Sequence, residues 1–77
     1  MKSIHDPRYE IVIQALVAAR IEHGITQTQL AIKLNRPQSF VAKVEGFDRR
    51  LDLVELKDWL TALEISARTF ANQFDWW

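Results

Sequence analysis

Cysteine is absent from this 77-residue sequence, and glycine and proline occur only twice each. Without cysteine there is no disulfide framework, no thiol chemistry and no Cys-ligated zinc, so a reducing cytoplasm is the expected compartment. No run approaches the ~18 apolar residues of a transmembrane helix. The first seven residues lack the apolar stretch of a signal peptide. His5 and His23 have no carboxylate at ligand spacing, so no metal and no cofactor is expected.

What is present is helical periodicity along nearly the whole chain. Apolar residues make up 48% of the sequence and recur three and four positions apart, which predicts an all-α fold. The length suits one domain over residues 1–77. Residues 1–5 are expected to form a loose arm at its start. The five predicted helices span residues 7–23, 27–34, 37–45, 53–63 and 67–74.

Two of these helices have broad apolar faces that predict the core. On the first, the face consists of Tyr9, Val12, Ile13, Leu16, Val17 and Ile21. On the fourth, which Asp52 is expected to cap with Glu55 three residues on, it consists of Leu53, Leu56, Trp59, Leu60 and Leu63, extended by Val54. Trp59 is expected in this core rather than as a stacking platform for single-stranded nucleic acid.

Residues 26–46 read as two short helices around a tight break. Thr26 with Gln29 three residues on forms a capping box. Asn35 interrupts the first helix, and Asn tolerates positive φ. Pro37 suits the start of the second helix, and Gly46 is expected to end it. This is the pattern of a helix-turn-helix.

The segment also resembles the Cro/repressor-type, XRE-like family of helix-turn-helix proteins. The matching positions are Gln27, Ala31, Asn35, Val41, Val44, Glu45 and Gly46. Arg36 and Pro37 depart from it, because the family often has an aliphatic residue and a Ser or Thr there. The resemblance implies a five-helix, lambda-repressor-like domain. It also implies an internal ion pair between Arg20 and Glu45, the alternative being that Arg20 reaches a phosphate.

The charge distribution favours double-stranded DNA as a partner, although the net charge is zero. Five basic residues lie between residues 26 and 51 against two acidic ones, and most other carboxylates lie outside. In the second motif helix, which should enter the major groove, the expected contacts are Gln38, Ser39, Ala42 and Lys43. Expected phosphate contacts are Gln27, Arg36, Arg49 and Arg50. Phe40 is expected to pack either on the scaffold or on DNA. The alternative for Gln38 and Ser39 is an ordinary solvated helix surface.

Four large aromatic residues close the chain: Phe70, Phe74, Trp76 and Trp77. So many aromatics in so short a segment predict an interface between two copies. The alternative is that they fold back on the first helix and complete the core of their own chain.

These features predict a sequence-specific transcriptional regulator, a small homodimeric repressor or activator that reads a palindromic operator. A phage-type repressor, a restriction-modification controller and an antitoxin all fit. The alternative is a protein-interaction module that keeps the fold and binds a protein partner such as a toxin. An enzyme is not expected, because there is no Gly-rich phosphate loop and no His is paired with Ser39.

Overall fold

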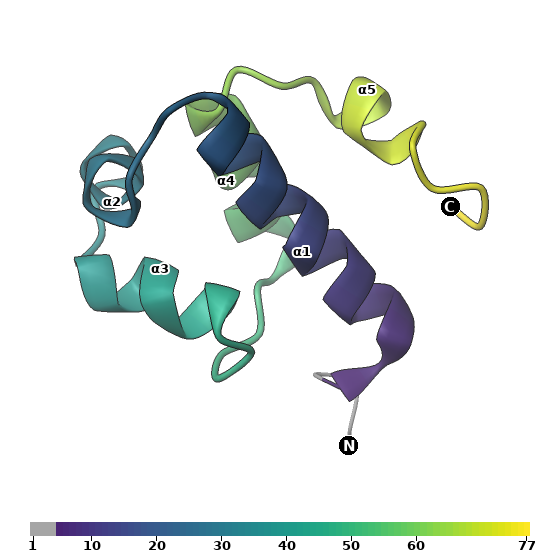
Figure 1. The fold of residues 1–77 in the computed structure, drawn as a ribbon, viewed down its shortest axis with the longest axis horizontal. Helices are drawn as coiled ribbons and strands as arrows, with labels where there is room; N and C mark the ends of the chain where they lie inside the picture. Colours follow the sequence, from purple (N-terminus) through teal and green to yellow (C-terminus); the bar gives the residue numbers. More distant parts are fainter. Residues whose placement is uncertain (1–4) are drawn as a thin grey trace.

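The computed structural model describes residues 5–77, which form helices joined by short connections (Figure 1). The helices are α1 (Pro7–Glu22), α2 (Gln27–Leu34), α3 (Gln38–Glu45), α4 (Leu53–Ala62) and α5 (Ala67–Ala71). No strand occurs in this described range, so the predicted all-α, five-helix fold is confirmed. An arm is expected over residues 1–5, and residues 1–4 of it lie outside the described part of the chain.

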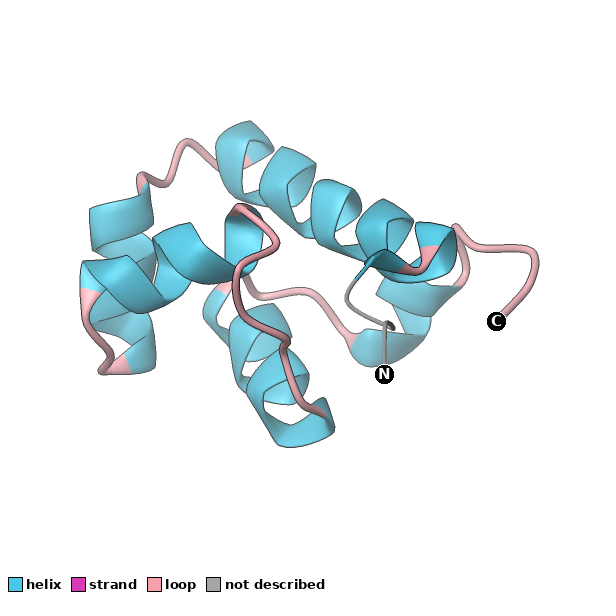
Figure 2. Ribbon diagram, turned by 90° about the horizontal axis from the view of Figure 1, so that it is seen from below, coloured by secondary structure: helices cyan, strands magenta, loops and turns pink. Residues whose placement is uncertain are grey.

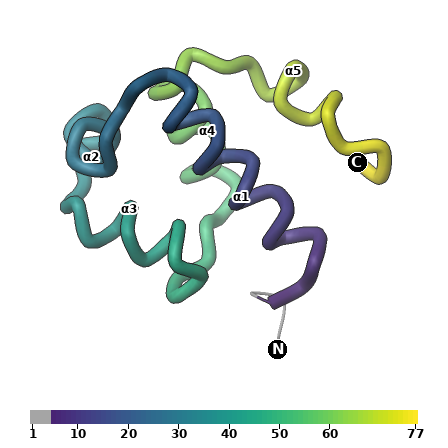
Figure 3. The backbone as a smooth tube through the Cα atoms, in the orientation of Figure 1, coloured from purple at the N-terminus to yellow at the C-terminus, as the bar shows by residue number. Residues whose placement is uncertain are grey.

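The helices lie on two sides of α1. Figure 1 shows α2 and α3 on one side of α1, and α5 with the C-terminus on the other. The view from below shows the same separation (Figure 2), and the tube in Figure 3 traces α4 crossing beneath α1. Contacts join α2 to α3 and α4, and α1 to α3. The helix-turn-helix is therefore held by both long helices.

Side chains cap the starts of four helices. Asp6 accepts the Arg8 N–H at 2.8 Å, and Ser66 accepts the Thr69 N–H at 3.0 Å. Thr26 at α2 and Asp52 at α4 each form a reciprocal capping box with the residue three positions on. Pro37 occupies the N-cap of α3 and makes no side-chain hydrogen bond there. Helix α3 thus begins without the side-chain cap that the other helices have.

Helices α1 to α4 each end in the same type of turn. After each helix a residue adopts positive φ, and its N–H and the next one bond back to carbonyls of the last turn. These residues are Gly24 (φ 70°), Asn35 (φ 58°), Phe47 (φ 63°) and Glu64 (φ 60°). Gly46 is the C-cap of α3, as expected, but its φ is −89° and the left-handed residue is Phe47, which follows it.

The core lies between α1, α2, α3 and α4. Its fully buried members include Ile13, Leu16, Leu30, Val41, Val44, Trp59 and Leu63. Three residues assigned to apolar faces are instead exposed: Ile21 (63%), Leu53 (79%) and Val54 (68%). Ile21 lies in the last turn of α1, and Leu53 and Val54 lie in the first turn of α4. Helical periodicity therefore found the buried faces but overran their ends.

The aromatic tail divides between the core and the surface. Phe70 is 2% exposed and Phe74 is 8% exposed, and their rings meet edge to face at 5.2 Å. These two belong to the core of their own chain, which corrects their assignment to an interface between copies. Trp76 and Trp77 remain 44% and 59% exposed.

The last helix is also shorter than expected, ending at Ala71 rather than at residue 74. The side-chain amide of Gln73 donates to the Phe70 carbonyl at 3.1 Å. In a continuing helix this carbonyl would accept the Phe74 N–H. The Phe74 N–H bonds instead to the Ala71 carbonyl at 3.0 Å, one position nearer. A side chain thus competes with the helical backbone bond and tightens the turn.

The left-handed turn after α4 predicts an unusual stabilisation by glycine. A non-glycine residue in this conformation costs roughly 1–2 kcal/mol, against a glycine entropy penalty of roughly 0.4–1 kcal/mol. Glu64→Gly should therefore raise the urea midpoint slightly, and Glu64→Val should lower it. Glu22→Gly, at an exposed position inside the last turn of α1, is the control and should be destabilising. Loss of stability in Glu64→Gly would contradict the assigned conformation.

Candidate nucleic-acid interface

One face of α3 is buried and the other presents polar side chains. Phe40, Val41 and Val44 are buried against the core. On the opposite face Gln38, Ser39 and Lys43 are exposed, and Ala42 is half-buried. The predicted base-contacting residues thus share one open face, at the N-terminal half and middle of the helix. Their exposure is the first condition for insertion into a groove.

Beneath this face lies the expected ion pair between α1 and α3. Arg20 Nε donates to Glu45 Oε2 at 2.7 Å, and its Nη2 donates to Oε1 at 3.0 Å. Its Nη1 also donates to the Ile25 carbonyl at 2.8 Å. The two side chains are only 11% and 7% exposed. Arg20 is therefore held inside the fold, which removes the alternative in which it reaches a phosphate.

The ion pair extends by hydrogen bonds to the surface of α3. Gln27 Nε2 donates to Glu45 Oε1 at 2.8 Å, and Gln38 Nε2 donates to Gln27 Oε1 at 2.8 Å. Because a carboxylate only accepts hydrogen bonds, Gln27 must turn its NH₂ group toward Glu45. Its oxygen then faces Gln38, which fixes the orientation of both amides. The sequence predicted the ion pair but not this relay.

Two predicted phosphate contacts, Arg36 and Arg49, form a cluster with Phe40 and Glu55. The guanidinium carbons lie 3.8 Å and 4.8 Å from the centroid of the Phe40 ring. Phe40 is 7% exposed and packs on Trp59 at 6.0 Å between ring centroids, so it belongs to the scaffold. Cations over an aromatic face are attracted by the ring quadrupole.

Glu55 supplies the negative charge of this cluster. Its carboxylate accepts Arg49 Nη1 at 2.8 Å and Nη2 at 3.0 Å, and Arg36 Nη1 at 3.4 Å. The hydrogen bond from Arg49 is the main cause that lowers the pKa of Glu55 from its ordinary value of 4.5 to about 2. The sequence identified Glu55 only as part of a helix cap, because no local pattern joins it to a residue nineteen positions away.

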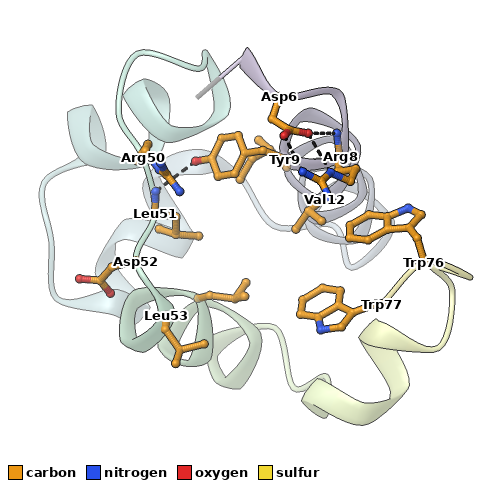
Figure 4. A pocket seen from close by; sticks show the side chains of 12 residues that line it. Asp6, Arg8, Tyr9, Val12, Arg50, Leu51, Asp52, Leu53, Trp76 and Trp77 are labelled. Carbon is orange, nitrogen blue, oxygen red and sulfur yellow. Dashed lines mark hydrogen bonds and ion pairs between the residues drawn. The ribbon is translucent and has the colours of Figure 1, made fainter. Parts of the chain in front are cut away.

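Arg50 lies on the same loop but faces the opposite way, toward α1. Its guanidinium carbon lies 5.7 Å from the centroid of the Tyr9 ring, whose hydroxyl accepts the Leu51 N–H at 3.0 Å (Figure 4). The structure therefore separates Arg50 from Arg49, although the two are adjacent in the chain. Among residues 5–77 no group of three or more metal-ligating side chains comes together. Within the same range, no helix is long and apolar enough to cross a membrane.

A second surface that the sequence did not predict is an apolar groove between α1, α4 and the C-terminal segment. It consists of two adjoining hollows of about 450 Å³ and 320 Å³ that share Leu53, Leu56 and Trp77. Figure 4 shows the Trp77 ring lying between α1 and α4, with Trp76 beside Val12 and Arg8. The sequence carries no sign of this groove, because the exposure of Leu53 depends on how α4 packs.

The relay makes a testable prediction about stability. Glu45→Ala would leave the Arg20 guanidinium almost buried without its carboxylate, and should destabilise the fold by roughly 3 kcal/mol. Replacing both partners by apolar residues of similar size should cost less. A double-mutant cycle by urea denaturation measures the coupling, and a coupling near zero would contradict the pair.

Comparison with known proteins agrees with this geometry. No protein-family model matches the chain, and no curated protein matches it. Among solved structures, an XRE-family like protein from Pseudomonas syringae pv. tomato str. DC3000 is 40% identical to it. The match covers 94% of this chain and 88% of that one, with a TM-score of 0.85. The chain therefore belongs to the XRE family of helix-turn-helix proteins, whose members bind DNA and are not enzymes.

Proposed function

We propose that this protein is a sequence-specific, DNA-binding transcriptional regulator that acts as a homodimer and places α3 in the major groove. The observation that carries the proposal is the relay from the buried ion pair to Gln38. It presents an oriented amide at the exposed N-terminal end of a helix. A major groove about 12 Å wide admits one α-helix, and base edges there carry a distinct pattern of donors and acceptors.

The orientation of Gln38 favours adenine. Gln38 gives one amide hydrogen to Gln27, which leaves its carbonyl oxygen and its second amide hydrogen for other partners. Adenine offers a donor at N6 and an acceptor at N7, which match this remaining pair. Ser39 contacts base or backbone, Ala42 allows close approach to a thymine methyl, and Lys43 reaches guanine or a phosphate. These roles are inferred from position on the open face.

Phosphate contacts position the helix in the groove without reading sequence. Gln27, at the first turn of α2, would contribute together with nearby backbone N–H groups. Arg36 and Arg49 flank α3 on the side of Phe40, and Arg50 lies toward Tyr9. Arg36 thus precedes α3 in the chain, and Arg49 and Arg50 follow it.

A homodimer is proposed because one α3 reads too few base pairs for useful specificity. Dimers of helix-turn-helix proteins read two half-sites about 34–36 Å apart. The apolar groove is the surface we assign to the second copy. Leu53, Val54, Trp76 and Trp77 are 44–79% exposed around it. Each large aromatic can bury roughly 150–250 Å², a sizeable part of the ~800 Å² per partner in a standard interface.

Base readout by Gln38 is tested on a duplex selected from a random pool. Gln38→Ala should cost roughly 1–3 kcal/mol on the selected duplex and relax the preference at one base pair. Binding to random DNA should change little. Gln14→Ala, at an exposed glutamine of α1, is the matched control and should have no effect on either duplex. An equal loss on both duplexes would assign Gln38 to the phosphates instead.

The proposed dimer surface is tested by Leu53→Glu in sedimentation velocity. Burying one leucine contributes roughly 1.5–3 kcal/mol and a homodimer buries two, so the dimer dissociation constant should rise by roughly a hundredfold or more. The side chain is 79% exposed in the single chain, so the helical content should stay the same. Ile32→Glu, at a 73% exposed position of α2, is the control. A wild-type protein that stays monomeric, or a Leu53→Glu variant that dimerises equally well, would refute this assignment.

A further inference from the structure

We propose that Glu55 is a specificity-determining residue of the DNA-binding surface. In this proposal, which rests on the proposed function, its carboxylate occupies the place that a DNA phosphate would otherwise take on Arg36 and Arg49. It thereby limits sequence-independent binding, while leaving base readout by α3 in place. The inference concerns a residue on α4, outside the helix-turn-helix itself.

The first observation is the geometry of the Arg49–Glu55 contact. Two nitrogens of the guanidinium donate to the two oxygens of the carboxylate, at 2.8 Å and 3.0 Å. This fork is also the geometry with which arginine binds a phosphate. Arg49 Nη1 donates in addition to the Arg50 carbonyl at 2.6 Å. The bidentate edge of Arg49 is therefore already engaged by a carboxylate of the same chain.

The second observation is that one carboxylate serves two arginines. Arg36 Nη1 reaches Glu55 Oε2 at 3.4 Å, and both arginine side chains are 39% exposed. Glu55 itself is 16% exposed, beneath them. Two cations and one anion leave a single net positive charge at this corner. Since salt-dependent affinity follows the number of phosphates neutralised, the cluster binds fewer phosphates than its arginines would alone.

The third observation is where the cluster sits. Arg36 comes just before α3 and Arg49 comes just after it, and both stack on the Phe40 ring of α3. Glu55 also accepts the Asp52 N–H at 3.1 Å, which fixes it at the start of α4. The carboxylate thus lies beside the recognition helix but on the Phe40 side, away from Gln38. Its charge acts on backbone contacts and not on the base-reading face.

The test is Glu55→Gln, which keeps the size of the side chain and removes its charge. Binding to a random duplex and to a selected duplex is measured between 50 and 200 mM salt. Each added phosphate contact contributes about 0.9 to the salt slope, or roughly three- to fourfold over this range. We expect random-duplex affinity to rise roughly three- to tenfold, with a slope steeper by about one to two. The selected duplex should gain less, so the specificity ratio falls.

Two further variants separate this effect from net charge and from folding. Glu64→Gln removes one negative charge at an exposed site after α4 and should change the slope by much less. Glu55→Asp keeps the charge but shortens the side chain, and should leave random-duplex affinity near that of the wild type. All proteins are compared at a temperature at which circular dichroism shows them folded.

The outcomes are distinguishable. If the wild type shows no salt-dependent DNA binding, the proposed function fails. If the wild type selects a sequence but Glu55→Gln behaves like Glu64→Gln, this inference alone is refuted. It is also refuted if Glu55→Gln weakens binding to both duplexes, because Glu55 would then only support the fold of the surface. An equal rise for Glu55→Asp and Glu55→Gln would refute the role of its charge.

Discussion

The buried contact between Arg20 and Glu45 is the constraint on which the orientation of the recognition helix depends. It joins α1 to the last turn of α3, and its two hydrogen bonds of 2.7 Å and 3.0 Å leave little freedom for rotation of that helix. A buried pair of this kind adds little net stability, but losing one partner is costly. Because Gln27 and Gln38 continue the hydrogen bonding outward, an internal electrostatic requirement also determines how a surface amide is presented.

Beside α3, ion pairs reduce the positive charge that basic side chains can offer to a partner. Arg36 and Arg49 are basic residues beside a helix suited to DNA, yet both are bound by Glu55. A count of basic residues therefore overstates the charge available to a phosphate backbone. The exposed apolar residues form a third surface, the groove between α1, α4 and the C-terminal segment, at the far end from α2. The exposed polar face of α3 and the apolar groove are thus separated on the molecule.

Much of the fold could be predicted because its signals are local. Thr26 with Gln29, Asp52 with Glu55, and Asn35 at positive φ are choices made within a few residues, and the structure has them as expected. The ends of the buried faces could not be predicted, because periodicity does not say which positions of an apolar face another element covers. Ile21 and Leu53 continue the apolar pattern but are exposed. Phe47, and not Gly46, adopts the left-handed conformation after α3, and its side chain packs against the core.

The sequence by itself determined the helices, the break at Asn35 and the residues available to α3, because capping, turn formation and helical spacing act within a few positions. It also indicated the Arg20–Glu45 pair, through resemblance to a family. Only the tertiary structure decided that Phe70 and Phe74 are core residues while Trp76 and Trp77 are not. It alone placed Glu55 against Arg36 and Arg49. Such contacts join positions that are far apart in the chain, and their existence depends on how the helices pack.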